Sequence, residues 1–327
     1  MHRWLGLPID DLQEAASVEL IKAVVNIASV KSAEEIKEIE KAVTISGAMH
    51  EAAMKAARPG MKEAELAGLI EGIALANDGD VAYPVILSVD GQILHNHYHG
   101  NTLEEGRLVL VDAGAETSGH YAGDITRTFP VSKTFTAQQK EIYEIVLKAE
   151  IDSIAQTTVG TRFLDVHLGA AKIIASGLKD LGLMKGDLDE AVAQGAHALF
   201  FPHGLGHMLG LDVHDMEDLG EQYVGYTDSL SRSKQFGLRS LRLARALEPG
   251  FVLTVEPGIY FIPQLIQLWE SEGKFKDFIN YDKLTDYLGF GGIRIEDNIL
   301  VTPDGPRILG HPIAKTIDEV EALRNFK

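Results

Sequence analysis

Residues 103–114 read Leu-Glu-Glu-Gly-Arg-Leu-Val-Leu-Val-Asp-Ala-Gly, and residues 247–258 repeat this pattern as Leu-Glu-Pro-Gly-Phe-Val-Leu-Thr-Val-Glu-Pro-Gly. Both stretches begin with a Leu-Glu-x-Gly turn, continue as an apolar strand and end in a carboxylate, Asp112 or Glu256, with a glycine two residues later. Chance does not explain why both copies carry an acid at the same place. The pattern indicates an internal duplication in which each half places one acid at the end of an equivalent strand.

The helices that precede these strands repeat as well. Capping boxes at Ser32 and Thr136 predict the starts of two long helices, which end near Gly60 and Gly160, 100 residues apart. Further helices are expected at 62–76 and 163–183, and two short ones after Asp187 and Thr316. This order predicts an α+β fold with two pseudo-symmetric halves around a mostly antiparallel sheet, helices on one face, and a site where the halves meet.

Two other segments are predicted from their patterns. Residues 81–89 favour a single strand that turns at Asp90-Gly91. His95, His97 and His99 alternate, so they share one face if their segment is a strand, and for His95 and His99 an exposed strand face is expected. Residues 265–287 are either a packed surface helix or a lid over a cleft.

The composition narrows the function. The 327 residues include 48 Asp or Glu and 30 Lys or Arg, which gives a formal net charge of −18, and there is no cysteine. An acidic chain is poorly suited to bind nucleic acid or an anionic membrane. The lack of cysteine excludes disulfides, thiolate metal sites and a cysteine nucleophile. Because no apolar run is long enough to span a bilayer and no secretory signal opens the chain, we expect a soluble, cytoplasmic protein.

Asp112 and Asp124 are the first candidate ligands. Asp112 ends a run of four apolar residues, where a charge is costly to bury unless it is paired or bound to a cation. Asp124 precedes Thr126 and Thr128 on one face of a predicted strand, and a hairpin through residues 117–119 would bring it beside Asp112. Two carboxylates this close repel each other unless a cation lies between them.

The histidine-rich segment 202–215 is the second source of ligands. Three histidines, His203, His207 and His214, share twelve residues with three glycines, a pattern that favours a backbone brought close to a site. A zinc protease helix of the His-Glu-x-x-His type is excluded because Gly204 follows His203. The carboxylates Glu256 and Glu296 each lie in a predicted strand rich in β-branched residues. Either one alone is weak evidence for a metal site.

Together these segments offer four carboxylates and one or two histidines without any thiolate. Such an oxygen-rich set can hold two divalent ions and favours Mn²⁺ or a similar first-row ion over a structural zinc. A pair of metals roughly 3.5–4 Å apart shares a hydroxide and polarises a carbonyl or phosphoryl oxygen. The residues therefore predict metal-assisted hydrolysis, but they do not define the substrate.

The motifs resemble one family, the pita-bread metallopeptidases. The resemblance is carried by His203-Gly-Leu-Gly-His207, by Val-Glu256-Pro-Gly-Ile-Tyr260 and by Arg294-Ile-Glu-Asp, and it covers residue 32 to the C-terminus. Within the family, the chain looks most like prolidase, the Xaa-Pro dipeptidase, with aminopeptidase P next. The resemblance implies a pita-bread fold, a catalytic domain at 32–327, and residues 1–31 as a linker or the remnant of an N-terminal domain.

The resemblance also implies roles for individual residues. Asp112 would bind one metal, His207 and Glu256 the other, and Asp124 and Glu296 both. Glu256 would also carry a proton from the attacking water to the leaving proline nitrogen. The remaining assignments are His214 and His97 for orienting substrate and stabilising the tetrahedral intermediate, Arg242 for the free carboxylate of a dipeptide, and His203, Tyr260 and Arg294 for supporting the ligands from outside. The expected metal is Mn²⁺, with Co²⁺ or Zn²⁺ as alternatives.

Three functions stay open at this point. The first is a dinuclear Xaa-Pro dipeptidase, and the second is an Xaa-Pro aminopeptidase that acts on longer peptides and does not need Arg242. The third is a binding module that keeps the fold without catalysis. The family leads us to expect a small peptide substrate with proline at its second position and a homodimer. One departure concerns Asp112 and Asp124, which are separated by one more residue than the family pattern, so their hairpin needs a longer turn or a bulge.

Overall fold

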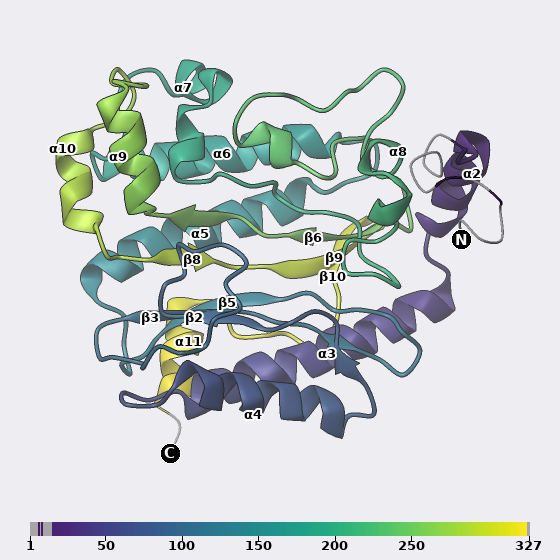
Figure 1. Ribbon diagram of the computed structural model, residues 1–327, viewed down its shortest axis with the longest axis horizontal. Helices are drawn as coiled ribbons and strands as arrows, with labels where there is room; N and C mark the ends of the chain where they lie inside the picture. Colours follow the sequence, from purple (N-terminus) through teal and green to yellow (C-terminus); the bar gives the residue numbers. More distant parts are fainter. Residues whose placement is uncertain (1–5, 7, 9–14, 326–327) are drawn as a thin grey trace.

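The computed structural model describes residues 6, 8 and 15–325 (Figure 1). Its helices form two pairs that match the predicted repeat: α3 (Ala33–Ala56) with α4 (Glu63–Ala76), and α5 (Ala137–Gln156) with α6 (Phe163–Asp180). The capping boxes at Ser32 and Thr136 are both formed, because each side chain accepts from the backbone three residues on while Glu35 or Gln139 reaches back. The helix predictions are therefore confirmed at their starts.

The remaining helices are short. They are α2 (Val18–Ala28), α7 (Leu188–Gln194), α8 (Glu221–Val224), α9 (Pro263–Ser271), α10 (Tyr281–Leu284) and α11 (Ile317–Arg324), with 3-10 turns η1 (Ala196–Leu199), η2 (Glu217–Leu219), η3 (Leu238–Ser240) and η4 (Thr285–Tyr287). Asp187 and Thr316 cap α7 and α11 as predicted. In the described part of the chain, every helix is too short or too polar to cross a membrane.

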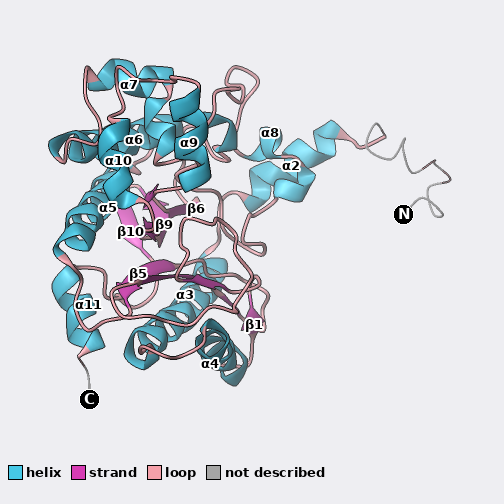
Figure 2. Ribbon diagram, turned by 60° about the vertical axis from the view of Figure 1, so that its left-hand side comes forward, coloured by secondary structure: helices cyan, strands magenta, loops and turns pink. Residues whose placement is uncertain are grey.

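All strand pairs between named strands are antiparallel. The first half contributes β2 (Ile86–Ser88), β3 (Leu108–Asp112) and β5 (Thr126–Pro130) in the order β2-β3-β5. The second half contributes β6 (Val252–Val255), β9 (Asp297–Thr302) and β10 (Gly305–Ile308) in the order β10-β9-β6, and β7 (Gly258–Tyr260) beside β8 (Gly292–Arg294). The helices α3 and α4 pack on the first-half strands and α5 packs on the second-half strands (Figures 1 and 2).

The two halves repeat in their hydrogen bonds as well as in their elements. The backbone N–H of Gly60 donates to Leu103 O at 2.8 Å, and that of Gly160 donates to Leu247 O at 2.8 Å. The turns that follow use Gly106 at φ 83° and Gly250 at φ 90°, values in the left-handed region that favours glycine. The internal duplication predicted from residues 103–114 and 247–258 is confirmed at atomic detail.

The prediction of one strand over residues 81–89 is wrong. The segment forms two separate strands, β1 (Asp80–Val81), which pairs with β4 (Ala115–Glu116), and β2, which pairs with β3. Tyr83-Pro84 lies at the break, where proline has no N–H to continue a ladder. The expected strand face at 95–99 is also wrong: these residues form a loop, and His95 has φ 54°, which no strand accommodates.

The segment between Asp112 and Asp124 forms a hairpin with a tight turn. Thr117 N–H donates to Tyr121 O at 3.0 Å, His120 N–H donates to Thr117 O at 2.8 Å, and His120 takes φ 65°. This is a three-residue hairpin loop with its last residue in the left-handed region. The structure thus shows a turn of three residues at this place, and the prediction that this turn is longer than in the family stays a prediction.

The segment 265–287 packs on the surface. Ile266 and Trp269 of α9 are buried, and the Trp269 ring meets the rings of Phe236 and Phe275. Among the described residues, none of this segment lines the cavity that contains Asp112, Asp124 and His207. Of the two alternatives left open by the sequence, the structure favours a packed surface helix.

Candidate metal centre

The predicted ligands come from both halves and meet in one cavity of about 820 Å³. Asp112 ends β3 and Asp124 lies just before β5, while Glu256 follows β6 and Glu296 directly precedes β9. The halves are joined at this point by an isolated bridge between Thr126 and Glu296. The site therefore forms where the two halves meet, as the duplication predicted.

His207 is held in place by the second half. The backbone N–H of His207 donates to Thr254 Oγ1 at 3.1 Å, and the backbone N–H of Thr254 donates to His207 O at 3.0 Å. Its ring Nδ1 lies 3.0 Å from Met208 O, which leaves Nε2 to face the cavity. Gly206 allows this close approach, because a Cβ there would lie 2.0 Å from Thr254 O. The glycine pattern around the histidines is explained by this packing.

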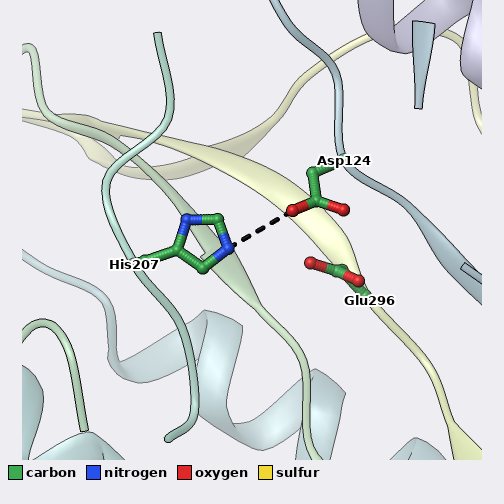
Figure 3. Close-up of side chains that lie close together, drawn as sticks. All are labelled: Asp124, His207 and Glu296. Carbon is green, nitrogen blue, oxygen red and sulfur yellow. Dashed lines mark ion pairs between the residues drawn. The ribbon is translucent and has the colours of Figure 1, made fainter. Parts of the chain in front are cut away.

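Three side chains converge closely enough to share one cation. Ligand atoms of Asp124, His207 and Glu296 all lie within 4.8 Å of one another, and all three residues are buried (Figure 3). His207 Nε2 lies 3.3 Å from Asp124 Oδ2 and 3.7 Å from Glu256 Oε1. Among the described residues, this is the cluster whose geometry suits a metal ion.

Tyr83 connects the two aspartates. Its hydroxyl lies 2.6 Å from Asp112 Oδ1 and 2.5 Å from Asp124 Oδ1. The single hydroxyl proton of Tyr83 can be donated to either carboxylate. On the other side of the cluster, Thr126 donates its hydroxyl proton to Glu296 Oε2 at 2.6 Å. Neither residue was predicted as part of the site. The signals were the Tyr83-Pro84 interruption of an apolar run and the position of Thr126 on the same strand face as Asp124.

The carboxylates of the cluster outnumber its cations. Desolvation raises the pKa of Glu296 well above its usual range, and the charges of Asp124, Glu256 and Asp112 raise it further. Desolvation also raises the pKa of Glu256 to about 7. Burial opposes a charge on His207, but its hydrogen bond to Asp124 and the charge of that carboxylate raise its pKa to about 9. Like charges this close are stable together when a cation is bound among them, so the donor set fits one or two divalent ions.

A chain of hydrogen bonds surrounds the ligands. Arg294 forms an ion pair with Asp112 and donates from Nη1 to Tyr260 Oη at 3.0 Å. Tyr260 Oη in turn lies 2.9 Å from His203 Nε2, and His203 Nδ1 lies 2.7 Å from Gly204 O. Glu256 Oε2 lies 3.9 Å from His203 Nδ1, beyond hydrogen-bond distance. The structure thus places His203, Tyr260 and Arg294 beside the candidate ligands, where the resemblance led us to expect supporting residues.

His214, His97 and Arg242 line the same cavity. The His214 ring lies 4.3 Å from the His207 ring between centroids, and burial together with the charge of His207 lowers the pKa of His214 to about 3. His97 is exposed on the loop after β2. Arg242 forms an ion pair with Glu217 and donates to Glu221 Oε1 at 3.0 Å, two contacts that the sequence did not predict.

The other histidines lie elsewhere, with one exception. His95 is exposed as expected, but it lies on a loop that lines the cavity and not on a strand. The Nε2 atom of His99 lies 3.0 Å from Val85 O, and the Nε2 atom of His50 lies 3.0 Å from Ala113 O. The remaining histidines, which are not among the lining residues, are His120, His167, His197 and His311. His2 lies outside the described residues.

The fold and the cluster define a domain of duplicated α+β architecture with a candidate metal site between its halves. The chain belongs to metallopeptidase family M24, whose profile matches residues 37–303. It is 40% identical over 298 residues to the Xaa-Pro aminopeptidase of Escherichia coli K12, covering 90% of this chain and 58% of that protein. It is 37% identical over 296 residues to the human Xaa-Pro dipeptidase, covering 88% of this chain and 58% of that protein.

A solved structure is similar to this chain in fold as well as in sequence. Aminopeptidase P from E. coli with the inhibitor Pro-Leu superposes with a TM-score of 0.77 at 38% identity, over 93% of this chain and 61% of that one. The pita-bread fold predicted from the motifs is confirmed by this match. The chain spans about three fifths of the length of the relatives named here.

Proposed function

We propose that this chain hydrolyses the bond between the first residue and a following proline in peptides. The observation that carries the proposal is the convergence of Asp124, His207 and Glu296 from both halves into one buried cluster. Support comes from the relatives, which are named Xaa-Pro dipeptidase and Xaa-Pro aminopeptidase. The substrate is accordingly a small peptide with proline at its second position.

The proposed cofactor is a pair of divalent ions, held by Asp112, Asp124, His207, Glu256 and Glu296. Carboxylate oxygens dominate this set, so Mn²⁺ is our first choice, with Co²⁺ or Zn²⁺ as alternatives. One solved E. coli relative is described as zinc-substituted. When bound, such ions activate water and polarise the scissile carbonyl.

The residues of the chain supply the proton transfers and the positioning. Glu256 lies in the cavity close to His207 and is proposed to accept a proton from the attacking water and return it to the leaving proline nitrogen. His214 stays neutral because its pKa is low, so a ring N–H is available to the carbonyl oxygen as negative charge develops there. His97 lines the same cavity and is proposed to orient the substrate.

Arg242 decides between a dipeptide and a longer peptide in this proposal. A free Arg242 would bind the carboxylate of a dipeptide, which is the Xaa-Pro dipeptidase function predicted first. In the structure, however, the guanidinium is already paired with Glu217 and Glu221. That pairing favours the second candidate, an Xaa-Pro aminopeptidase that releases the first residue of longer peptides.

The test compares substrates that differ in length. Release of the first residue is measured from an Xaa-Pro dipeptide and from a matched Xaa-Pro-Yaa tripeptide, with Mn²⁺-loaded protein and its Arg242→Ala variant. Dipeptide cleavage that Arg242→Ala abolishes would establish the dipeptidase, and tripeptide cleavage that is indifferent to Arg242 would establish the aminopeptidase. If the loaded protein cleaves neither substrate, the proposal is wrong.

We further propose a boundary at Ser32, with residues 32–327 as the catalytic domain and residues 1–31 as a linker or remnant whose described part packs on it through Val25 and Lys31. The capping box at Ser32, which opens the first repeat helix, supports this boundary. A homodimer and a cytoplasmic location are proposed from the family resemblance and from the composition, respectively. Sedimentation of the purified chain at several concentrations tests the dimer, and a constant monomer mass would exclude it.

A further inference from the structure

Arg242 is held at one end by two glutamates that line the same cavity. Both contacts fall on Nη1, which forms an ion pair with Glu217 and lies 3.0 Å from Glu221 Oε1. The Glu217 side chain is only 11% exposed and the Arg242 side chain is 32% exposed. This is a partly desolvated ion pair, where charges interact more strongly than on the open surface.

The backbone of 216–221 is shaped to present both acids. Met216 has φ 64° and Gly220 has φ 116°, so the chain turns sharply before Glu217 and again before Glu221. Glu217 begins η2 and Glu221 begins α8. The two carboxylates therefore reach Arg242 from successive short turns.

No other cation of the cavity is free to replace Arg242. Among the described lining residues, the only arginines or lysines are Arg242 and Arg294, and Arg294 is bonded to Asp112 and Tyr260. A peptide that ends in a proline carboxylate would add a negative charge to a wall whose cations are already neutralised. A peptide that continues past proline presents an uncharged amide there.

We propose that Glu217 and Glu221 set the substrate preference on the carboxyl-terminal side of proline, by neutralising Arg242 and so favouring peptides that continue beyond it. This inference rests on the proposed hydrolysis of Xaa-Pro bonds. Glu217 carries the larger effect, because Glu221 also forms an ion pair with Arg232, which is outside the described cavity lining. Glu217 also lies 3.5 Å from His214 Nδ1, so a test has to separate the effect on the carboxylate from an effect on turnover.

The experiment isolates the terminal charge. The value of kcat/KM is measured for Ala-Pro and for Ala-Pro-amide, which differ in that charge, with metal-loaded wild type, Glu217→Gln, Glu221→Gln and Asp218→Asn. Glutamine keeps the shape and the hydrogen-bonding oxygen of glutamate while it removes the charge. Asp218→Asn is the matched control, since it removes the same charge from an exposed lining residue, whereas the ion pairs of Arg242 are with Glu217 and Glu221.

We expect Glu217→Gln to raise the acid-to-amide ratio of kcat/KM about five- to tenfold, mainly through KM, the size expected for one unit charge a few ångströms away under solvent screening. Glu221→Gln raises it less, and Asp218→Asn changes it less than twofold. Adding Arg242→Ala to Glu217→Gln removes the gain, because the gain comes from the released guanidinium.

Three results would overturn the inference alone: a ratio that falls or stays constant in both glutamate variants, an equal gain in Asp218→Asn, or a gain that persists without Arg242. The wild-type rate on Ala-Pro-amide serves as the separate reading of the proposed function. Protein that cleaves neither compound overturns that function and this inference with it.

Discussion

Tyr83 shows how one residue outside any metal motif can organise the site. Its hydroxyl lies between Asp112 and Asp124, at 2.6 and 2.5 Å from their oxygens. Residues that hydrogen-bond metal ligands from outside fix the ligand orientation, and their loss typically reduces metal affinity or activity by 10–100-fold. Tyr83 is thus as much a part of the candidate centre as the ligands that it contacts.

We therefore expect Tyr83→Phe to lower Mn²⁺ affinity by about 10- to 100-fold without unfolding the protein. Competition with a chelator measures the affinity, and circular dichroism checks the fold. Tyr121→Phe is the control, because Tyr121 donates to Glu35 at 3.1 Å and is not among the cavity lining residues. Equal affinities in the two variants would contradict the role given to Tyr83.

The sequence predicts the ligand types better than their partners. Asp112, Asp124 and His207 stand out because acids and histidines next to apolar strands and glycines are costly without a ligand. Glu217 and Glu221 have no such local signal, because their contacts to Arg242 arise from the packing of segments more than twenty residues apart. Partners of this kind need a three-dimensional structure.

At the scale of elements, the two glycine turns before β3 and β6 offer a matched test of the duplication. Gly106 has φ 83° and a Cβ added there would meet no atom within 4 Å, whereas Gly250 has φ 90° and a Cβ would lie 2.8 Å from Val30 Cγ1. A left-handed conformation costs a residue with a Cβ about 1–2 kcal/mol. An alanine at either position therefore pays the cost of the left-handed backbone, and an alanine at Gly250 also clashes with Val30.

We expect Gly106→Ala to lower the free energy of unfolding by about 1–2 kcal/mol, and Gly250→Ala to lower it further because Val30 has to move. Chemical denaturation of both variants against wild type provides the measurement. A neutral Gly106→Ala would mean that the turn does not require its left-handed glycine, and would weaken the equivalence of the two turns.

The strand errors have local physical causes. The apolar run at 81–89 is typical of a strand, but Pro84 cannot donate to a ladder, and the chain at Tyr83 turns toward Asp112 and Asp124. The alternating histidines at 95–99 suggest a strand by period alone, yet His95 takes a positive φ. Helices were predicted more reliably because capping boxes mark their first turns.

Between α6 and η1, His167 and His197 are buried with ring nitrogens that have no partner among the described residues. Burial lowers the pKa of His167 to about 3 and that of His197 to about 4, from a usual 6.5. Between pH 6.5 and about 4, the unfolded state therefore binds more protons at these sites than the folded state. Their contribution to stability falls as the pH falls through this window.

We expect the loss of unfolding free energy between pH 7 and pH 5 to be smaller by about 2 kcal/mol in His197→Leu than in wild type, and by a similar amount in His167→Leu. Urea denaturation at the two pH values measures each difference. His311→Leu is the control, because that side chain is exposed. A pH dependence that is unchanged in both buried variants would contradict the neutral, buried state of the two rings.

At the scale of the whole molecule, the site is also the joint between the halves. Arg127 of β5 is 1% exposed and donates to Asp297 Oδ1 and to Glu296 O, each at 2.6 Å. Thr128 Oγ1 accepts from Arg294 N–H at 3.1 Å, and its hydroxyl donates to Arg294 O at 3.0 Å. These bonds hold the first-half strands against the segment that carries Glu296, so they contribute to positioning the candidate ligands of both halves.

The duplication explains why a dinuclear centre suits this fold. Each half supplies an acid at the end of an equivalent strand, Asp112 after β3 and Glu256 after β6, and the halves bring these acids together with Asp124 and Glu296 in one cavity. The overall architecture was predictable from the repeat and the motifs. The depth of the cavity and the pairing of its charges were not, because they depend on how the two halves close around it.

The most direct test of the proposed dinuclear hydrolysis is the rate of Xaa-Pro-Yaa cleavage as metal-free protein is titrated with Mn²⁺ at protein concentrations well above the dissociation constants. We predict no cleavage without metal and a rate that reaches its plateau at two equivalents per chain, since the proposal assigns five ligands from two halves to two ions. Cleavage that survives complete metal removal, or a plateau at one equivalent, would contradict the account.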